Sequence, residues 1–97
     1  MFTSKQRSHL KSLGANLEPV MQVGKDGITD NLLKSLSEAL EARELIKVTI
    51  LETATDEPKA FAVELAEALS AEVVITMGRK TVLYRRSSRK NFNHIEY

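Results

Sequence analysis

Apolar residues recur every three or four positions in three stretches of the chain, a spacing that predicts amphipathic helices. The first helix is predicted to start after Thr3 or Ser4, either of which can cap it, and to stop near Asn16. Gly14 predicts a frayed or bent end of this helix. Its apolar positions are Leu10, Leu13 and Leu17.

The two later helical stretches have clear start signals. Thr29 can cap a helix that closes at residues 42–44, and Pro58 lies in the first turn of a helix that follows Asp56 or Glu57. The apolar side of the earlier helix consists of Leu32, Leu33, Leu36, Ala39 and Leu40. The apolar stripe of the later helix consists of Phe61, Ala62, Leu65, Ala66 and Leu69.

Four short stretches favour β-strands: residues 20–23, 45–51, 73–77 and 81–85. Apolar and polar residues alternate in the second stretch, where the polar positions are Lys47 and Thr49. A strand buried on one face only is therefore predicted there. Residues 78–80 contain a glycine and are typical of a hairpin loop between the last two strands.

The elements follow one another in the order α-β-α-β-α-β-β, which predicts a two-layer α/β fold with a four-stranded mixed sheet. Right-handed crossovers place the second and third helices on one face of the sheet, and the last strand is expected to be antiparallel to the third. Residues 1–86 are predicted to form a single domain. Residues 87–97 lack periodicity and are predicted to be a flexible basic tail.

The composition is that of an ordinary globular domain, with 97 residues of which 42% are hydrophobic and 28% are charged. Because the chain contains no cysteine, disulfides, thiol chemistry and cysteine-based metal sites are excluded. No segment has the length and apolarity of a membrane span or a signal peptide, so a cytoplasmic protein is expected. No catalytic or cofactor-binding motif is present, and neither an enzyme nor a cofactor is expected.

Charge is distributed unevenly along the chain, although the net charge is only +1. Residues 1–27 carry a net charge of +2, residues 28–78 a net charge of −6, and residues 79–97 a net charge of +5. The basic ends indicate a surface that faces a polyanion. The alternative is that the basic residues 85–90 only form a solubilising tail.

A short loop of Gly24, Lys25, Asp26 and Gly27 connects the first strand to the second helix. Glycines let a ligand approach the main chain, a helix start offers unpaired N–H groups, and Lys25 adds a cation, so a phosphate-binding loop is predicted. The alternative is that the glycines only form a tight turn. Asp26 and Asp30 count against a phosphate site, because Asp30 would itself satisfy the helix dipole.

Three separated segments resemble those of the CRM domain (chloroplast RNA splicing and ribosome maturation). They are the loop at residues 24–27, the sequence Glu-Ala-Arg-Glu-Leu-Ile-Lys-Val at 41–48, and Met-Gly-Arg-Lys-Thr-Val-Leu-Tyr-Arg at 77–85. The match runs from about residue 2 to residue 86 and resembles in particular the stand-alone bacterial YhbY-type proteins. Asp26 departs from the small or neutral residue that is frequent at its position.

The resemblance implies a fold like the C-terminal domain of translation initiation factor three. It also implies RNA binding through the GxxG loop and, for the bacterial members, a link to precursors of the large ribosomal subunit. Ribosomal RNA is therefore the expected partner, and the protein is expected to be a monomer that needs no cofactor. Phosphate contacts would supply most of the affinity, and RNA shape would supply the selectivity.

The predicted RNA-binding residues come from the loop, the first helix, the hairpin and the last strand. They are Gly24, Lys25, Asp26, Gly27, Lys5, Arg7, Lys11, Arg79, Lys80, Tyr84 and Arg85. Tyr84 is the candidate for stacking on a base, and the alternative for this residue is a partly buried position in a strand.

Two other functions can be set against RNA binding. In the first, the protein is an interaction module whose acidic helices dock a basic ribosomal protein through Glu38, Glu41, Glu64 and Glu67. In the second, it is a phosphate-processing enzyme that uses the same loop. Such an enzyme would need a base, a nucleophile or a metal cluster near Lys25, and Asp26 and Asp30 alone do not make one.

Overall fold

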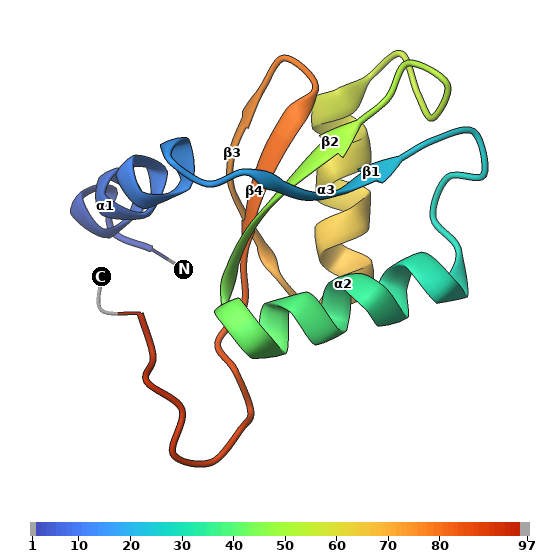
Figure 1. The fold of residues 1–97 in the computed structure, drawn as a ribbon. Coiled ribbons are helices and arrows are strands. Elements are labelled where there is room, and N and C mark those ends of the chain that lie inside the picture. Colours follow the sequence, from blue (N-terminus) through green and yellow to red (C-terminus); the bar gives the residue numbers. More distant parts are fainter. Residues whose placement is uncertain (1, 96–97) are drawn as a thin grey trace.

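The computed structural model describes residues 2–95 and has the predicted order of elements (Figure 1). These elements are α1 (Ser4–Ala15), β1 (Pro19–Val23), α2 (Asp30–Arg43), β2 (Leu45–Ile50), α3 (Pro58–Leu69), β3 (Glu72–Met77) and β4 (Lys80–Tyr84). The sheet has the strand order β1-β2-β4-β3, in which β1 and β2 are parallel and the other two pairs are antiparallel. The predicted α/β fold with a four-stranded mixed sheet is confirmed.

Hydrogen bonds confirm the predicted caps of α1 and α2, whereas α3 begins at Pro58 as predicted but Glu57 before it makes no side-chain capping hydrogen bond. The Thr3 hydroxyl accepts a hydrogen bond from the Gln6 backbone N–H at 3.1 Å, and the Gln6 side chain accepts one from the Thr3 N–H at 2.9 Å. The Thr29 hydroxyl accepts a hydrogen bond from the Leu32 N–H at 3.1 Å. These caps satisfy backbone donors that have no partner inside the helix.

The apolar core lies on both faces of the sheet. Helices α2 and α3 cover one face, where the buried residues are Val23, Leu36, Leu40, Ile46, Val48, Leu65, Ala66, Leu69 and Leu83. Helix α1 packs on the opposite face, where the buried residues are Leu10, Leu45, Val74, Val82 and Tyr84. No helix within residues 2–95 has the length and apolarity to cross a membrane.

Two predictions fail where α1 meets the sheet. Strand β2 is buried on both faces, because α1 covers Lys47, whose side chain is only 8% exposed and donates a hydrogen bond to the Ala15 carbonyl oxygen at 3.4 Å. Gly14 does not fray the helix, which continues to Ala15. Instead Gly14 is buried, and it allows the α1 backbone to approach Val82 closely.

Candidate nucleic-acid interface

The loop between β1 and α2 is a tight turn with an exposed tip. The Gly27 N–H donates a hydrogen bond to the Gly24 carbonyl oxygen at 2.9 Å and closes the turn. Lys25 and Asp26 occupy the two central positions of the turn, and both are exposed. The loop therefore presents one cation and one anion side by side.

The structure of the loop requires glycine at position 27 but not at position 24. Gly27 has a φ of +64°, a conformation that disfavours any residue with a side chain. Gly24 has no such backbone requirement, and a Cβ atom built there would lie 3.6 Å from the Thr53 hydroxyl oxygen and 3.8 Å from a methyl group of Leu51. These are ordinary contact distances, so packing within the protein does not require glycine at position 24.

The start of α2 contributes less to an anion site than the sequence suggests. The helix begins at Asp30, and the Thr29 side chain already accepts the Leu32 N–H. The Asp30 carboxylate lies in the first turn, where it interacts favourably with the helix dipole. An anion-binding role therefore depends mainly on the loop itself and on Lys25.

The sheet brings the loop and the hairpin to the same end of the molecule. The Leu51 N–H donates a hydrogen bond to the Val23 carbonyl oxygen at 2.9 Å, and the Ile50 N–H donates one to the Arg79 carbonyl oxygen at 2.7 Å. The end of β1, the end of β2 and the start of β4 are thereby joined. The predicted residues at this end are Gly24, Lys25, Asp26, Gly27, Arg79 and Lys80.

The remaining predicted residues lie elsewhere. Figure 1 shows α1 on the side of the sheet away from the loop between β1 and α2. Tyr84 and Arg85 lie at the end of β4 opposite to Lys80. The structure therefore divides the predicted residues into two groups, and the second group consists of Lys5, Arg7, Lys11, Tyr84 and Arg85.

Three of the predicted arginines make hydrogen bonds within the protein. Arg7 donates to the carbonyl oxygens of Val73 and Val74, at 2.9 Å each. These carbonyls lie at the irregular register of the edge strand β3, so Arg7 fastens α1 to that edge.

Arg79 and Arg85 tie other backbone segments together. Arg79 donates to the Thr55 carbonyl oxygen at 2.7 Å and thus holds the connection between β2 and α3. Arg85 donates to the Leu69 carbonyl oxygen at 2.9 Å and also contacts α2. In contrast, the predicted cations with exposed side chains are Lys5, Lys11, Lys25 and Lys80.

Tyr84 is buried, with 5% of its surface exposed. Its ring meets the Phe2 ring edge to face, with centroids 5.4 Å apart and an angle of 73° between the planes. This position agrees with the alternative of a buried strand residue. The role of Tyr84 in stacking on a base stays a prediction.

The C-terminal segment is docked onto two carboxylates. Glu44 is fully buried and accepts hydrogen bonds from the Ser87 N–H at 2.6 Å and the Ile95 N–H at 2.7 Å. His94 Nδ1 lies 2.5 Å from the same carboxylate, and the Ser88 hydroxyl donates to Glu41. The sequence did not predict these four anchors, which are Ser87, Ser88, His94 and Ile95. The flexibility of residues 87–97 as a tail stays a prediction.

The two carboxylates are stabilised in their charged form. Burial raises the pKa of Glu44, but the hydrogen bonds from His94 and from the Ser87 and Ile95 amides outweigh burial, and the pKa lies below its ordinary value. The Ser88 side-chain hydrogen bond is the main cause that lowers the pKa of Glu41.

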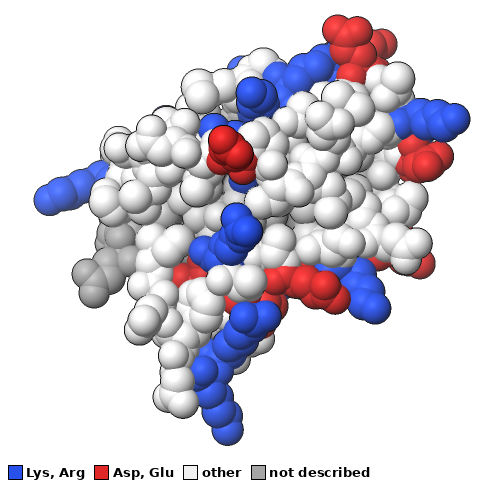
Figure 2. Space-filling model, viewed as in Figure 1, with Lys and Arg blue, Asp and Glu red and all other residues white. Residues whose placement is uncertain are grey.

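Figure 2 shows acidic side chains in a band across the lower part of the molecule, with Lys and Arg side chains beside it.

Arg86 is an exposed cation that was not among the predicted residues. Side chains alternate along a strand, so Tyr84 and Arg86 continue on the face of α1 while Leu83 and Arg85 continue on the face of α2 and α3. If this alternation is continued past the end of β4, it predicts from the sequence that Arg85 and Arg86 lie on opposite faces of the sheet. This signal could have identified Arg86 as an exposed cation. Residues 2–95 contain no group of three or more His, Asp or Glu side chains that could hold a metal ion.

Comparison with known proteins gives one consistent family. The model of the CRS1/YhbY (CRM) domain matches residues 2–85. The chain is 42% identical over 87 residues to the Probable RNA-binding protein YqeI of Bacillus subtilis, an alignment that covers 90% of this chain and 91% of that protein. It is 33% identical over 92 residues to a probable RNA-binding protein of Pseudomonas aeruginosa, with coverage of 95% and 88%.

A solved structure agrees with this family. The solution structure of a hypothetical protein from Staphylococcus aureus, described as a candidate RNA-binding protein, superimposes with a TM-score of 0.78 at 42% sequence identity. The superposition covers 94% of this chain and 95% of that protein. The chain therefore belongs to the CRS1/YhbY (CRM) domain family.

Proposed function

We propose that this protein binds RNA of the precursor of the large ribosomal subunit through the loop of residues 24–27. It acts in the cytoplasm as a monomer and binds RNA without catalysing a reaction. Support comes from the family, whose bacterial relatives are named as probable RNA-binding proteins, and from the exposed loop tip with Lys25.

The observation that carries the proposal is the absence of a side chain at Gly24. Neither the backbone conformation nor the packing of this chain requires glycine there. A glycine without a structural reason is explained if a ligand has to approach the main chain closely. A phosphate group fits this explanation, because Lys25 and the backbone N–H groups of the loop can donate to it.

Exposed lysines extend the contact surface beyond the loop. Lys80 lies at the same end of the sheet as Lys25, and Lys5 and Lys11 lie on α1. An RNA helix or folded loop that reaches both regions would gain affinity from phosphates and selectivity from its shape. Asp26 weakens the attraction of the loop for phosphate, so an Asp26→Asn variant is expected to bind RNA more tightly.

Fluorescence anisotropy with labelled fragments of large-subunit ribosomal RNA tests this proposal. Gly24→Ala should leave the folded structure intact, as measured by circular dichroism, and weaken RNA binding about threefold to tenfold. Lys25→Ala should weaken binding by a similar factor, because it removes one charge-assisted contact. The matched control is Arg43→Ala, which removes an exposed cation at the far end of α2.

Equal affinities of the wild type, Gly24→Ala, Lys25→Ala and Arg43→Ala would refute the role of the loop. The competing interaction module is tested in parallel by charge reversal of the exposed acids Glu38, Glu64 and Glu67. If the reversed protein leaves the ribosomal fraction while the loop variants remain in it, the protein docks a basic protein and RNA binding is not its function.

A further inference from the structure

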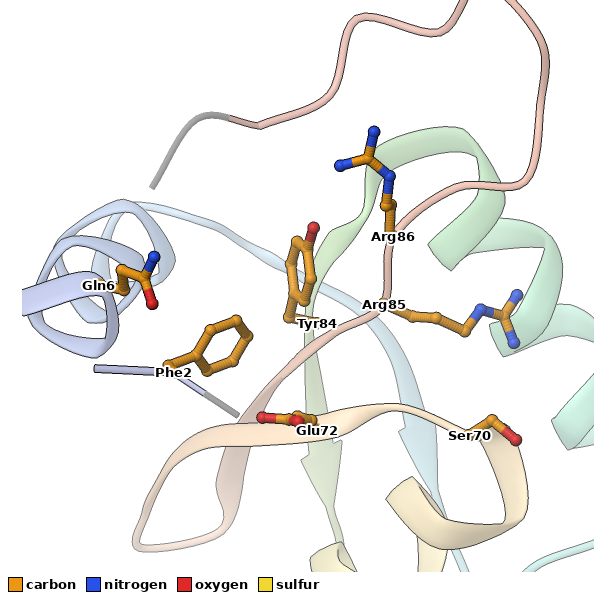
Figure 3. Close-up of a pocket in the computed structure, with 7 residues that line it drawn as sticks. All are labelled: Phe2, Gln6, Ser70, Glu72, Tyr84, Arg85 and Arg86. Carbon is orange, nitrogen blue, oxygen red and sulfur yellow. The ribbon is translucent and has the colours of Figure 1, made fainter. Parts of the chain in front are cut away.

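An open groove lies where α1 meets the last strands, at the end of the sheet away from the GxxG loop. Its volume is about 440 Å³, which is within the range of small-molecule sites. The residues that line it are Phe2, Gln6, Ser70, Glu72, Tyr84, Arg85 and Arg86 (Figure 3). Both an aromatic surface and side chains of opposite charge therefore face one cavity.

The aromatic part of the groove consists of the Phe2 and Tyr84 rings. Phe2 is partly exposed, and its ring meets the buried Tyr84 ring edge to face. The Arg7 guanidinium lies 5.7 Å from the centre of the Phe2 ring, and it also donates a hydrogen bond to the Val73 carbonyl oxygen of the edge strand β3. A flat ring that is held in place on one wall of a groove is suited to contact another flat ring.

Charges are arranged at different places along the groove. Figure 3 shows Arg85 directed toward α2, whereas Arg86 is directed to the side where the Tyr84 hydroxyl points. Glu72 lies on β3, below Phe2 in the same view. An anionic group would be attracted toward Arg86 and repelled by Glu72.

The position of Arg86 is defined by the residue that follows it. Ser87 is buried, its N–H donates to the Glu44 carboxylate at 2.6 Å, and its hydroxyl donates to the Glu41 carbonyl oxygen at 2.8 Å. The backbone therefore leaves β4 along a fixed path. Arg86 is presented beside the groove although it lies outside a helix or strand.

We infer that this groove accepts one unpaired nucleotide of single-stranded RNA, with the base against Phe2 and the phosphate at Arg86. The inference deepens the proposed RNA-binding function and rests on it. Stacking on aromatic side chains and a cation for the phosphate are the features by which proteins hold unpaired nucleotides. The amide oxygen of Gln6 already accepts the Thr3 N–H, but its NH₂ group adds a hydrogen-bond donor for the edge of the base.

The groove complements the loop of residues 24–27. The loop offers a lysine and main-chain groups, which suit backbone phosphates, but it offers no aromatic ring. The groove offers the ring that the loop lacks. A folded RNA that contacts both would place a base-paired region at the loop and an unpaired nucleotide at the groove.

Two measurements test the groove. The first is an NMR titration with adenosine monophosphate and, separately, with ribose 5-phosphate, which lacks the base. Adenosine monophosphate should shift the ring resonances of Phe2 and Tyr84 and the Arg86 amide, whereas ribose 5-phosphate should leave the two rings unchanged. Equal shifts from both compounds, or shifts confined to other residues, would overturn the inference.

The second measurement is the anisotropy of a labelled adenosine tetranucleotide. Arg86→Ala and Phe2→Leu should each weaken its binding about tenfold. Arg89→Ala is the matched control, because it removes an exposed cation of the same segment that does not line the groove, and it should change affinity less than twofold. Circular dichroism verifies the fold of each variant.

The two proposals can fail separately. If Arg86→Ala and Arg89→Ala weaken tetranucleotide binding equally, the groove is not a nucleotide site, even when Lys25→Ala still weakens binding of the ribosomal RNA fragments. If Lys25→Ala and Gly24→Ala have no effect on those fragments while the groove variants lose the tetranucleotide, the role of the loop fails and the groove stands.

Discussion

Arg85, at the end of β4, is joined to Ser37 of α2 by two hydrogen bonds. Its guanidinium donates to the Ser37 carbonyl oxygen at 3.0 Å and to the Ser37 hydroxyl at 2.9 Å. A third bond reaches the Leu69 carbonyl oxygen at the end of α3. Arg85 thus connects both helices of one layer to the sheet, which is a structural role for a residue of a basic segment.

We expect Arg85→Lys to destabilise the protein by about 1–3 kcal/mol, because an ammonium group cannot reproduce the fork of guanidinium bonds to two helices. Chemical denaturation measures this loss. RNA affinity of the folded variant should stay within twofold of the wild type.

Lys80→Gln is the control, because it removes an exposed cation. Its stability should be unchanged and its RNA binding should be weaker. A stable Arg85→Lys protein with lost RNA affinity would assign Arg85 to the binding surface instead.

We expect Gly14→Ala to lower the stability, although alanine favours helices. A Cβ at Gly14 would lie 2.8 Å from one methyl carbon of Val82 and 3.0 Å from the other. Overpacking of this kind costs about 1–3 kcal/mol, against a helix-propensity gain of about 1 kcal/mol. The melting temperature should therefore fall by roughly 5 °C.

A second background checks the cause of that loss. In a Val82→Ala protein the space above Gly14 is larger, so Gly14→Ala should cost much less there than in the wild type. An equal cost in both backgrounds would show that contact with Val82 is not the reason for glycine at this position.

Docking of the C-terminal segment should weaken in acid. The pKa of the Glu44 carboxyl lies below its ordinary value of 4.5, because the hydrogen bonds from His94, Ser87 and Ile95 outweigh the effect of burial. The folded state then binds fewer protons than the unfolded state near this pH. Above pH 4.5 the charged Glu44 carboxylate contributes its full stabilisation of the folded state. This stabilisation is lost as the pH falls through the lowered pKa of Glu44.

NMR titration of the Ser87 and Ile95 amide protons measures this effect. Both amides should shift together with a midpoint below pH 4.5 and should lose their downfield positions as Glu44 is protonated. Glu44→Gln keeps an acceptor oxygen but cannot titrate, so this transition should disappear in the variant. A common midpoint at or above pH 4.5 would contradict the lowered pKa.

RNA binding should depend on salt with a slope set by the exposed lysines. If Lys5, Lys11, Lys25 and Lys80 each contact one phosphate, the logarithm of affinity should fall against the logarithm of salt concentration with a slope of roughly three, by the single-strand coefficient. Removing Lys25 should reduce the slope by about 0.7. A slope near zero in the wild type would exclude phosphate contacts as the source of affinity.

The elements of this fold could be predicted from local signals. Thr3 and Thr29 are side chains that satisfy helix N–H groups within three residues, so their effect does not depend on the rest of the chain. The turn at residues 24–27 is equally local, because its closing hydrogen bond joins residues three positions apart. The element order and the mixed sheet followed from these signals and from the handedness of crossovers.

The roles of the charged side chains could not be predicted in this way. Arg7, Arg79 and Arg85 resemble surface cations in the sequence, but each donates to carbonyl oxygens that are far away along the chain. The C-terminal segment has no periodicity, yet its anchors on Glu44 are set by residues 43 and 51 positions apart. Partners at such separations are specified only after the sheet has formed.

The sequence by itself determined the family, the elements and the loop of residues 24–27, because these depend on short segments. Tertiary structure decided which cations stay exposed, that α1 covers Lys47, that Gly14 of α1 packs against Val82, and that Phe2, Glu72 and Arg86 line one groove. The physical reason is that burial and hydrogen-bond partners depend on which elements meet across the sheet. Local periodicity specifies the faces of an element but not what covers them.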